Sequence, residues 1–207
     1  MWRDDEIGVK ALLTDDIRLI MQAIPTETLI GKRNRAIILL GYAGAFRRSE
    51  LVSLTMNDLQ DDVNGLIVRI TKSKTDQHAF GRLVAIPNGA HTLTCPVATI
   101  RLWRNTADIN EGPLFRGISR YVVFAPTKLS DRSIALIIKQ CVRAAGLDPT
   151  HYAGHSLRAG HCTQASRAGV AEHVIRKQTG HHSGNTLQRY MRVGALFVEN
   201  SAGALGL

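Results

Sequence analysis

A tyrosine and two adjacent histidines stand near the end of the chain, in the stretch TGHHSGNTLQRYMR (179–192). A tyrosine hydroxyl is a nucleophile once it loses its proton, and a histidine can exchange a proton near neutral pH. His181, His182 and Tyr190 are therefore candidates for one reactive site. Buried tyrosines and surface histidines are also common, so this chemistry depends on partners elsewhere in the chain.

The stretch GHSLRAG contains the first such partners, His155 and Arg158. Their spacing of three residues places both side chains on one face of a helix. A cation and a histidine at a helix N-terminus, beside a glycine, can bind a phosphate. An isolated HxxR is more often a solvated helix start, so this pair gains weight only from the other motifs.

The stretch GAFRRSEL contains a second candidate, Arg47, after a turn and at the start of a helix. Glu50 lies three residues further and is spaced to hold the Arg47 guanidinium. A fixed guanidinium presents a planar fork that matches two phosphate oxygens. An ordinary surface ion pair is equally common for this motif taken alone.

Lys72 and Lys74 lie in TKSKTDQHAFG, the turn between two predicted strands. A lysine on a hairpin tip can reach into a groove and protonate a leaving oxygen. Most hairpin lysines are simply solvated, so these two residues are weak candidates in isolation.

A hydrolytic metal or serine site has less support in the sequence. The histidines His151, His155, His161, His173, His181 and His182 are numerous, but HExxH is absent and no carboxylate accompanies them at ligand spacing. We expect His91 and His173 on the surface and predict no metal site. The GxSxG motif of a serine nucleophile is also absent.

The charge of the chain favours a polyanionic partner. Lysine and arginine total 26 against 17 acidic residues, which gives a net charge of +9 among 207 residues. Three cysteines without a CxxC pair predict reduced, partly buried side chains rather than disulfides or structural zinc. The charged start MWRDDEIGVK and the lack of a long apolar run predict a cytoplasmic protein without a membrane span.

Apolar spacing and helix caps predict the elements that must position these side chains. Residues 1–13 are expected outside the main core, and Thr14 is the predicted N-cap of the first helix. LIVRI (66–70) and RLVAI (82–86) are rich in β-branched residues and predict a small antiparallel hairpin. The prediction is a mainly α domain with this one small sheet, an α+β fold. The remaining predicted helices cover residues 14–24, 33–42, 47–54, 96–108, 130–145, 155–168, 171–179 and a short segment from Asn185 or Thr186 through Tyr190.

The order and spacing of these pieces resemble one family. An arginine in GxFRRSEL, a lysine in an SKT hairpin, HxxR, and GH followed nine residues later by tyrosine are together similar to the catalytic domain of the tyrosine recombinase (phage integrase) family. Each motif is weak alone, but five in this order are specific. The resemblance runs from about Thr14 past Tyr190 and implies that family's catalytic-domain fold.

The resemblance also implies a role for each residue. Arg47 and Arg158 match the two catalytic arginines, with Glu50 as the supporting acidic residue after Arg47. His155 matches the HxxR histidine. His181 matches the second histidine of the site, which leaves His182 as a bystander. Lys74 best matches the hairpin lysine, with Lys72 as the alternative general acid, and Tyr190 matches the nucleophile.

The implied reaction needs neither a metal nor a nucleotide cofactor. Tyr190 would attack a phosphodiester of double-stranded DNA, while the arginines neutralise the nonbridging oxygens. The product is a 3′-phosphotyrosyl linkage with a free 5′-hydroxyl, which can reverse the attack. The family implies a homo-oligomer, with a tetramer in the synaptic complex on DNA. It also implies a cytoplasmic, nucleoid-associated protein that is encoded by a prokaryote, a phage or a plasmid.

The domain expectations follow from the same resemblance. Residues 14–192 would form the catalytic domain, and residues 1–13 a linker or the remnant of an N-terminal DNA-clamping region. The tail 193–207 would dock on a neighbouring protomer or pack on its own domain. Two other functions stay open at this point: DNA relaxation, as in a type IB topoisomerase, and DNA binding without catalysis. The target DNA sequence and the biological outcome are not encoded in these motifs.

Overall fold

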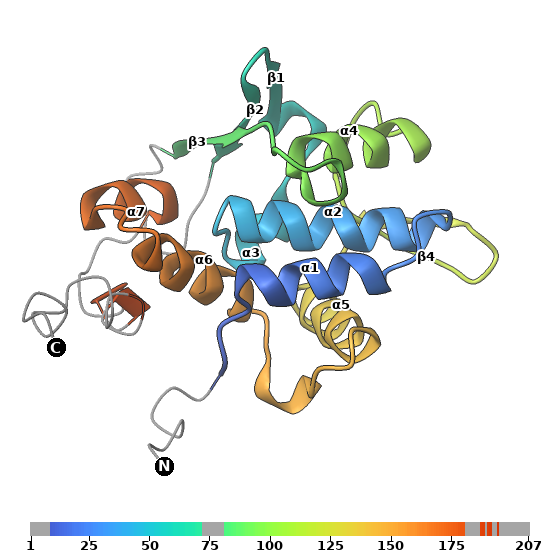
Figure 1. The fold of residues 1–207 in the computed structure, drawn as a ribbon. Helices are drawn as coiled ribbons and strands as arrows, with labels where there is room; N and C mark the ends of the chain where they lie inside the picture. Colours follow the sequence, from blue (N-terminus) through green and yellow to red (C-terminus); the bar gives the residue numbers. More distant parts are fainter. Residues whose placement is uncertain (1–8, 72–80, 181–186, 189, 192–193, 195–207) are drawn as a thin grey trace, which may run out of the picture.

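The chain folds into seven helices and two small sheets over the residues that its computed structural model describes, which are 9–71, 81–180, 187, 188, 190, 191 and 194 (Figure 1). This confirms the predicted mainly α, α+β class. The helices are α1 (Thr14–Ala23), α2 (Leu29–Ala43), α3 (Arg48–Ser53), α4 (Pro96–Thr106), α5 (Asp131–Ala144), α6 (Ser156–Arg167) and α7 (Glu172–Thr179). Single 3-10 turns lie at Met56–Asp58, Thr92–Thr94 and Pro149–His151.

Helix α2 is the centre of the molecule, and α1, α4, α5 and α6 pack around it (Figure 1). Its residues Ile37, Ile38 and Leu40 are fully buried. The helix begins at Leu29, four residues before the predicted start, because the Thr28 hydroxyl accepts the Gly31 N–H at 3.0 Å and caps it. The extension contains Gly31, a residue that disfavours a helix interior, so the local sequence does not predict it.

The predicted hairpin is present as β2 (Gly65–Ile70) and β3 (Arg82–Pro87), paired antiparallel with Val68 opposite Val84. The expectation of one two-stranded sheet is wrong in two respects. A further strand, β1 (Leu59–Asp62), pairs with β2. A second sheet joins β4 (Arg116–Ile118) to β5 (Phe124–Lys128). These three strands lack the β-branched runs on which the prediction depended.

Most predicted helix boundaries agree with the structure, and one cap does not. Ser130 caps α5 by accepting the Ser133 N–H at 3.1 Å, and Gly180 ends α7 with a positive φ of 64°. Thr14, however, is the first helical residue rather than the N-cap. Its hydroxyl hydrogen-bonds the Tyr42 hydroxyl at 2.9 Å, while Asp16 accepts the Leu13 N–H and caps α1 instead.

The segment before α1 is part of the core, contrary to expectation for its last residues. Leu12 is fully buried. The N–H of Lys10 donates to the carbonyl of His151 at 2.7 Å, and the N–H of Leu12 donates to the carbonyl of Ser156 at 3.0 Å. The core therefore begins before Thr14, and these contacts tie the start of the described chain to the Pro149–His151 turn and to α6.

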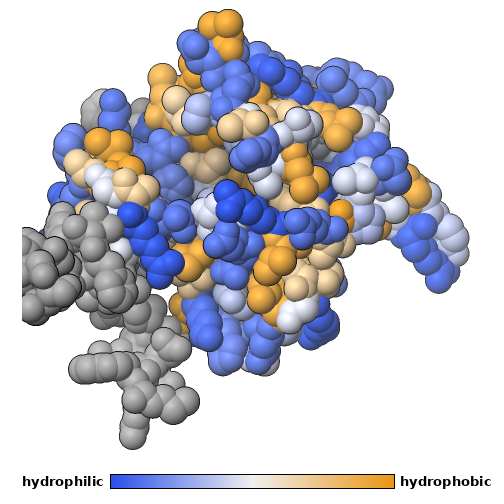
Figure 2. All heavy atoms as spheres, in the orientation of Figure 1, coloured by the Kyte–Doolittle hydropathy of each residue, from blue (hydrophilic) through white to orange (hydrophobic). Residues whose placement is uncertain are grey.

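The surface and the cysteines agree with the composition. On the face shown in Figure 2, polar residues dominate and apolar residues form separate spots. His91 and His173 are exposed, as predicted. Cys95, Cys141 and Cys162 are free thiols, as predicted, and are buried rather than partly buried. Among the described helices, none has the length and apolarity to cross a membrane.

Candidate active site

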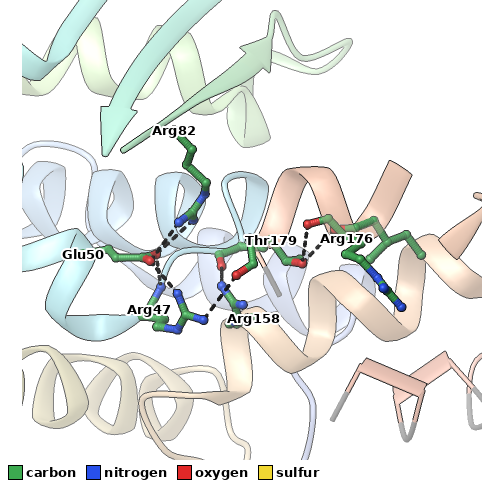
Figure 3. Close-up of polar contacts among 9 residues, drawn as sticks. Arg47, Glu50, Arg82, Arg158, Arg176 and Thr179 are labelled. Carbon is green, nitrogen blue, oxygen red and sulfur yellow. Dashed lines mark hydrogen bonds and ion pairs between the residues drawn. The ribbon is translucent and has the colours of Figure 1, made fainter. Parts of the chain in front are cut away.

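Arg47 is fixed at the N-terminus of α3 by Glu50, the contact that their spacing predicted (Figure 3). The Arg47 Nη1 donates to Glu50 Oε1 at 2.8 Å, and the Arg47 backbone N–H donates to Glu50 Oε2 at 2.9 Å. The Arg47 Nη2 also donates to the Gly180 carbonyl at 3.4 Å. Gly180 is the last described residue before His181.

A second arginine, Arg82, pairs with the same carboxylate and was not singled out from the sequence. Its Nη1 donates to Glu50 Oε1 at 2.9 Å, and its Nη2 donates to Glu50 Oε2 at 3.1 Å. The Glu50 side chain is only 1% exposed. Burial alone would raise the Glu50 pKa, but hydrogen bonds and charge from Arg82 and Arg47 hold it below its ordinary value. Glu50 is therefore a carboxylate shared by two guanidinium groups.

Arg158 reaches the same place from the first turn of α6. It is buried, and its Nη1 donates to the Ala45 carbonyl at 2.8 Å, in the turn that leads to Arg47 (Figure 3). Burial, together with the charge of Arg47, lowers the Arg158 pKa to about 10, which leaves it protonated at neutral pH. The buried Nη2 of Arg158 has no hydrogen-bond partner within the described part of the chain.

His155 is the N-cap residue of α6, one residue before the helix begins. It is exposed, yet partial desolvation lowers its pKa, and the charges of Arg48, Arg158 and Arg47 lower it further. The predicted HxxR pair thus places a neutral imidazole beside positive charge. A neutral imidazole can accept a proton.

Tyr190 lies in a helical segment that packs on α6 and α7. Leu187 is fully buried in a small cluster with Cys162 and Ile175, and Tyr190 packs partly buried against that cluster. The Ser166 hydroxyl donates to the Met191 carbonyl at 3.0 Å. Contacts from α6 and α7 therefore hold the segment that contains Tyr190 against these two helices. Helix α6 follows His155, and α7 ends at Gly180.

The remaining predicted residues fall outside the described part of the chain. These are Lys72, Lys74, His181, His182, the predicted helix start at Asn185 or Thr186, and most of the tail 193–207. Within the described residues, no group of three or more histidine, cysteine or acidic side chains is placed to hold a metal ion. The structure thus brings together Arg47, Glu50 and Arg158, adds Arg82, and places His155 next to them.

Comparison with known proteins finds one family along nearly the whole chain. The model of the phage integrase family matches residues 10–195. The integrase/recombinase xerD homolog of Selenomonas ruminantium is 40% identical over 194 residues, which are 94% of this chain and 57% of that protein. The tyrosine recombinase XerA of Thermococcus kodakarensis is 29% identical over 89% of this chain and 58% of its own length. The chain thus spans just over half the length of these relatives.

Solved structures share the fold at lower sequence identity. A XerH site-specific recombinase, solved in a post-cleavage complex with its palindromic difH substrate, superposes with a TM-score of 0.73 at 16% identity. That match covers 96% of this chain and 54% of the XerH chain. The lambda integrase catalytic core has a TM-score of 0.56 at 18% identity, over 84% of this chain and 93% of the core.

Proposed function

The chain belongs to the phage integrase family, and from that membership we propose that it cleaves and rejoins DNA strands in site-specific recombination. Tyr190 is the nucleophile of this proposal, and a 3′-phosphotyrosyl linkage is its covalent intermediate. The observation that carries the proposal is the pair of guanidinium groups of Arg47 and Arg158, held at one place by α3 and α6. Two adjacent cations in a partly buried site favour a bound anion.

A phosphodiester has the charge and the acceptor atoms that this site can bind. Its two nonbridging oxygens carry the negative charge, and each can accept from one guanidinium fork. The buried Nη2 of Arg158 would gain an acceptor, which removes the free-energy cost of leaving it unsatisfied. The same contacts strengthen as charge grows on those oxygens in the pentacoordinate transition state.

The proposed reaction is a reversible transesterification. The Tyr190 oxygen forms a bond to phosphorus, and the bond from phosphorus to the 5′-oxygen breaks. The Tyr190 proton passes to His155, whose lowered pKa keeps it neutral and able to accept. Lys74, or Lys72 in its place, protonates the departing 5′-oxygen, and His181 donates a hydrogen bond to the phosphate. Attack by a 5′-hydroxyl then restores a phosphodiester.

The partners follow from the charge and from the related structures. The net charge of +9 favours binding to a nucleic acid backbone. The XerH structure has its difH substrate bound, and a lambda integrase structure is a tetramer on a Holliday junction. We propose that residues 14–192, together with the packed segment that includes Leu12, act as the catalytic domain on double-stranded DNA, that four copies act together, and that the tail 193–207 docks on a neighbouring protomer. The proposed place of action is the nucleoid.

The proposal is tested by trapping the intermediate. A substrate with a nick close to the scissile phosphate loses a short fragment after cleavage, so the adduct accumulates. We expect a protein–DNA adduct in the presence of a metal chelator, and none with Tyr190→Phe. Tyr121→Phe is the matched control, because Tyr121 is exposed on the β4–β5 hairpin and should leave the adduct yield unchanged. DNA binding without any adduct would instead make the chain a non-catalytic binding module.

A further inference from the structure

Arg82 is a charged residue of the site that has no part in the proposed reaction. It is the first residue of β3 and comes from a different part of the fold than Arg47 and Arg158. Its side chain is 17% exposed and makes a bidentate pair with Glu50, at 2.9 and 3.1 Å. A planar fork on a carboxylate fixes both groups in orientation, which a lysine at this position would not do.

The pair with Glu50 gives Arg82 a route to Arg47. Both carboxylate oxygens of Glu50 accept from Arg47 as well, one from its Nη1 and one from its backbone N–H. Two arginines and one carboxylate leave a net charge of +1 on the three side chains. Arg82 therefore offsets the charge of Glu50, so the field of Arg47 on a bound phosphate is not cancelled by its own partner.

Arg82 also contacts the turn that ends α7. A Cβ atom at Gly180 would lie 3.0 Å from the Arg82 Cζ and Nη1, so the guanidinium packs directly on the Gly180 backbone. The carbonyl of the same glycine accepts from Arg47 Nη2 at 3.4 Å. Arg82 thus connects β3, Glu50 on α3 and the end of α7, the three places that surround Arg47 (Figure 3).

We propose that Arg82 is a positioning residue that holds Glu50 and Gly180 so that the Arg47 guanidinium is placed and charged for the scissile phosphate. The proposal rests on the proposed function. This role does not require a direct contact between Arg82 and DNA. Loss of Arg82 should therefore weaken the stabilisation of negative charge on the nonbridging oxygens. It should not act on the attack by Tyr190.

A methylphosphonate at the scissile position separates these two effects. It replaces one charged nonbridging oxygen by a neutral methyl group, so the reaction depends less on arginine charge. The measured quantity is the ratio of adduct-formation rates on the phosphodiester and on the methylphosphonate. This ratio is independent of the fraction of folded protein.

We expect Arg82→Ala to slow adduct formation on the phosphodiester by about 100-fold, the scale of a misplaced catalytic group, and to lower the ratio by a similar factor. Arg82→Lys keeps the charge and loses the fork, so its ratio should be intermediate. Arg101→Ala is the matched control, because Arg101 also pairs with a carboxylate, that of Asp61 at 2.8 Å, but away from the site. It should leave the ratio unchanged.

Two results would overturn the proposal. One is an Arg82→Ala protein with the wild-type rate, and the other is a rate loss that is equal on both substrates. If Arg82→Ala does not fold, Arg82→Lys decides the question by the same ratio. A wild-type protein that forms no adduct would instead refute the proposed function, and with it this role for Arg82.

Discussion

At the level of single residues, Glu50 joins one arginine that is close in the sequence and one that is distant. Arg47 and Glu50 are three residues apart, and the structure has the predicted hydrogen bonds between them. Arg82 pairs with Glu50 across 32 residues. Nothing in RLVAI distinguishes this arginine from a solvated residue at a strand end, because only the fold brings it to Glu50.

The environment of His155 predicts how DNA cleavage depends on pH. Its pKa is lowered by desolvation and by three neighbouring arginines, so it lies below the ordinary value of about 6.5. A base must be neutral to accept a proton. We therefore expect the rate of adduct formation to be constant near neutral pH and to fall only as the pH drops through this lowered pKa. Single-turnover rates between pH 5 and pH 8 measure it.

The control for this profile is His155→Ala, which should be slow throughout and should lose the acidic limb of the curve. An acid role for His155 requires the opposite sign. In that case, the wild-type rate would increase as the pH falls toward the lowered pKa, and that result would contradict the assignment of His155 as the base.

At the scale of elements, caps and glycines identified helix ends better than strand patterns identified strands. Ser130 and Gly180 were correct ends because a cap acts within one helical turn. The strand β1, with the sequence LQDD, has two acidic residues and is held by its pairing with β2. Such pairing is set by tertiary contacts, so local composition could not predict it.

Gly180 both ends α7 and contacts two arginines, so its substitution should affect stability and cleavage. Its φ of 64° is unfavourable for a residue with a side chain, and a Cβ would press on Arg82. Gly180→Ala should therefore lower the free energy of unfolding by about 1 kcal/mol and also slow adduct formation. Chemical denaturation and the trapping assay measure the two effects.

Gly146→Ala is the matched control for the backbone effect. Gly146 follows α5 with a φ of 78°, and a Cβ there would meet no atom within 4 Å. The Gly146→Ala variant should lose a similar free energy of unfolding and keep the wild-type cleavage rate. Equal cleavage rates for the two variants would mean that the contact between Gly180 and Arg82 has no role in the site.

At the scale of the whole molecule, the fold class was predictable because apolar spacing fixes most helices, but the extent of the core was not. Leu12 stands in a short mixed segment with no periodicity, and it is buried because Gly160 on α6 lets the chain approach. A Cβ at Gly160 would lie 1.7 Å from the Leu12 carbonyl oxygen. This close approach joins segments that are far apart in sequence, so no local pattern predicts it.

Substitution of Leu12 should therefore lower the stability of the domain. Leu12→Ala should lower the free energy of unfolding by about 3 kcal/mol, the usual cost of a cavity at a fully buried leucine. Leu19→Ala is the matched control, because Leu19 on α1 is 46% exposed and should change stability by less than about 0.5 kcal/mol. Equal losses for the two variants in urea denaturation would show that the segment before α1 does not belong to the core.

The strand polarity of the covalent linkage is the decisive measurement for the proposed reaction. A nicked DNA substrate is labelled in two preparations, on the 5′ side or on the 3′ side of the scissile phosphate, and incubated with the protein in chelator. We expect that only the 5′-side label migrates with the protein, as a 3′-phosphotyrosyl adduct, and that the released fragment has a 5′-hydroxyl that a kinase can phosphorylate. Attachment to the 3′-side label, or an adduct that persists in Tyr190→Phe, would contradict it.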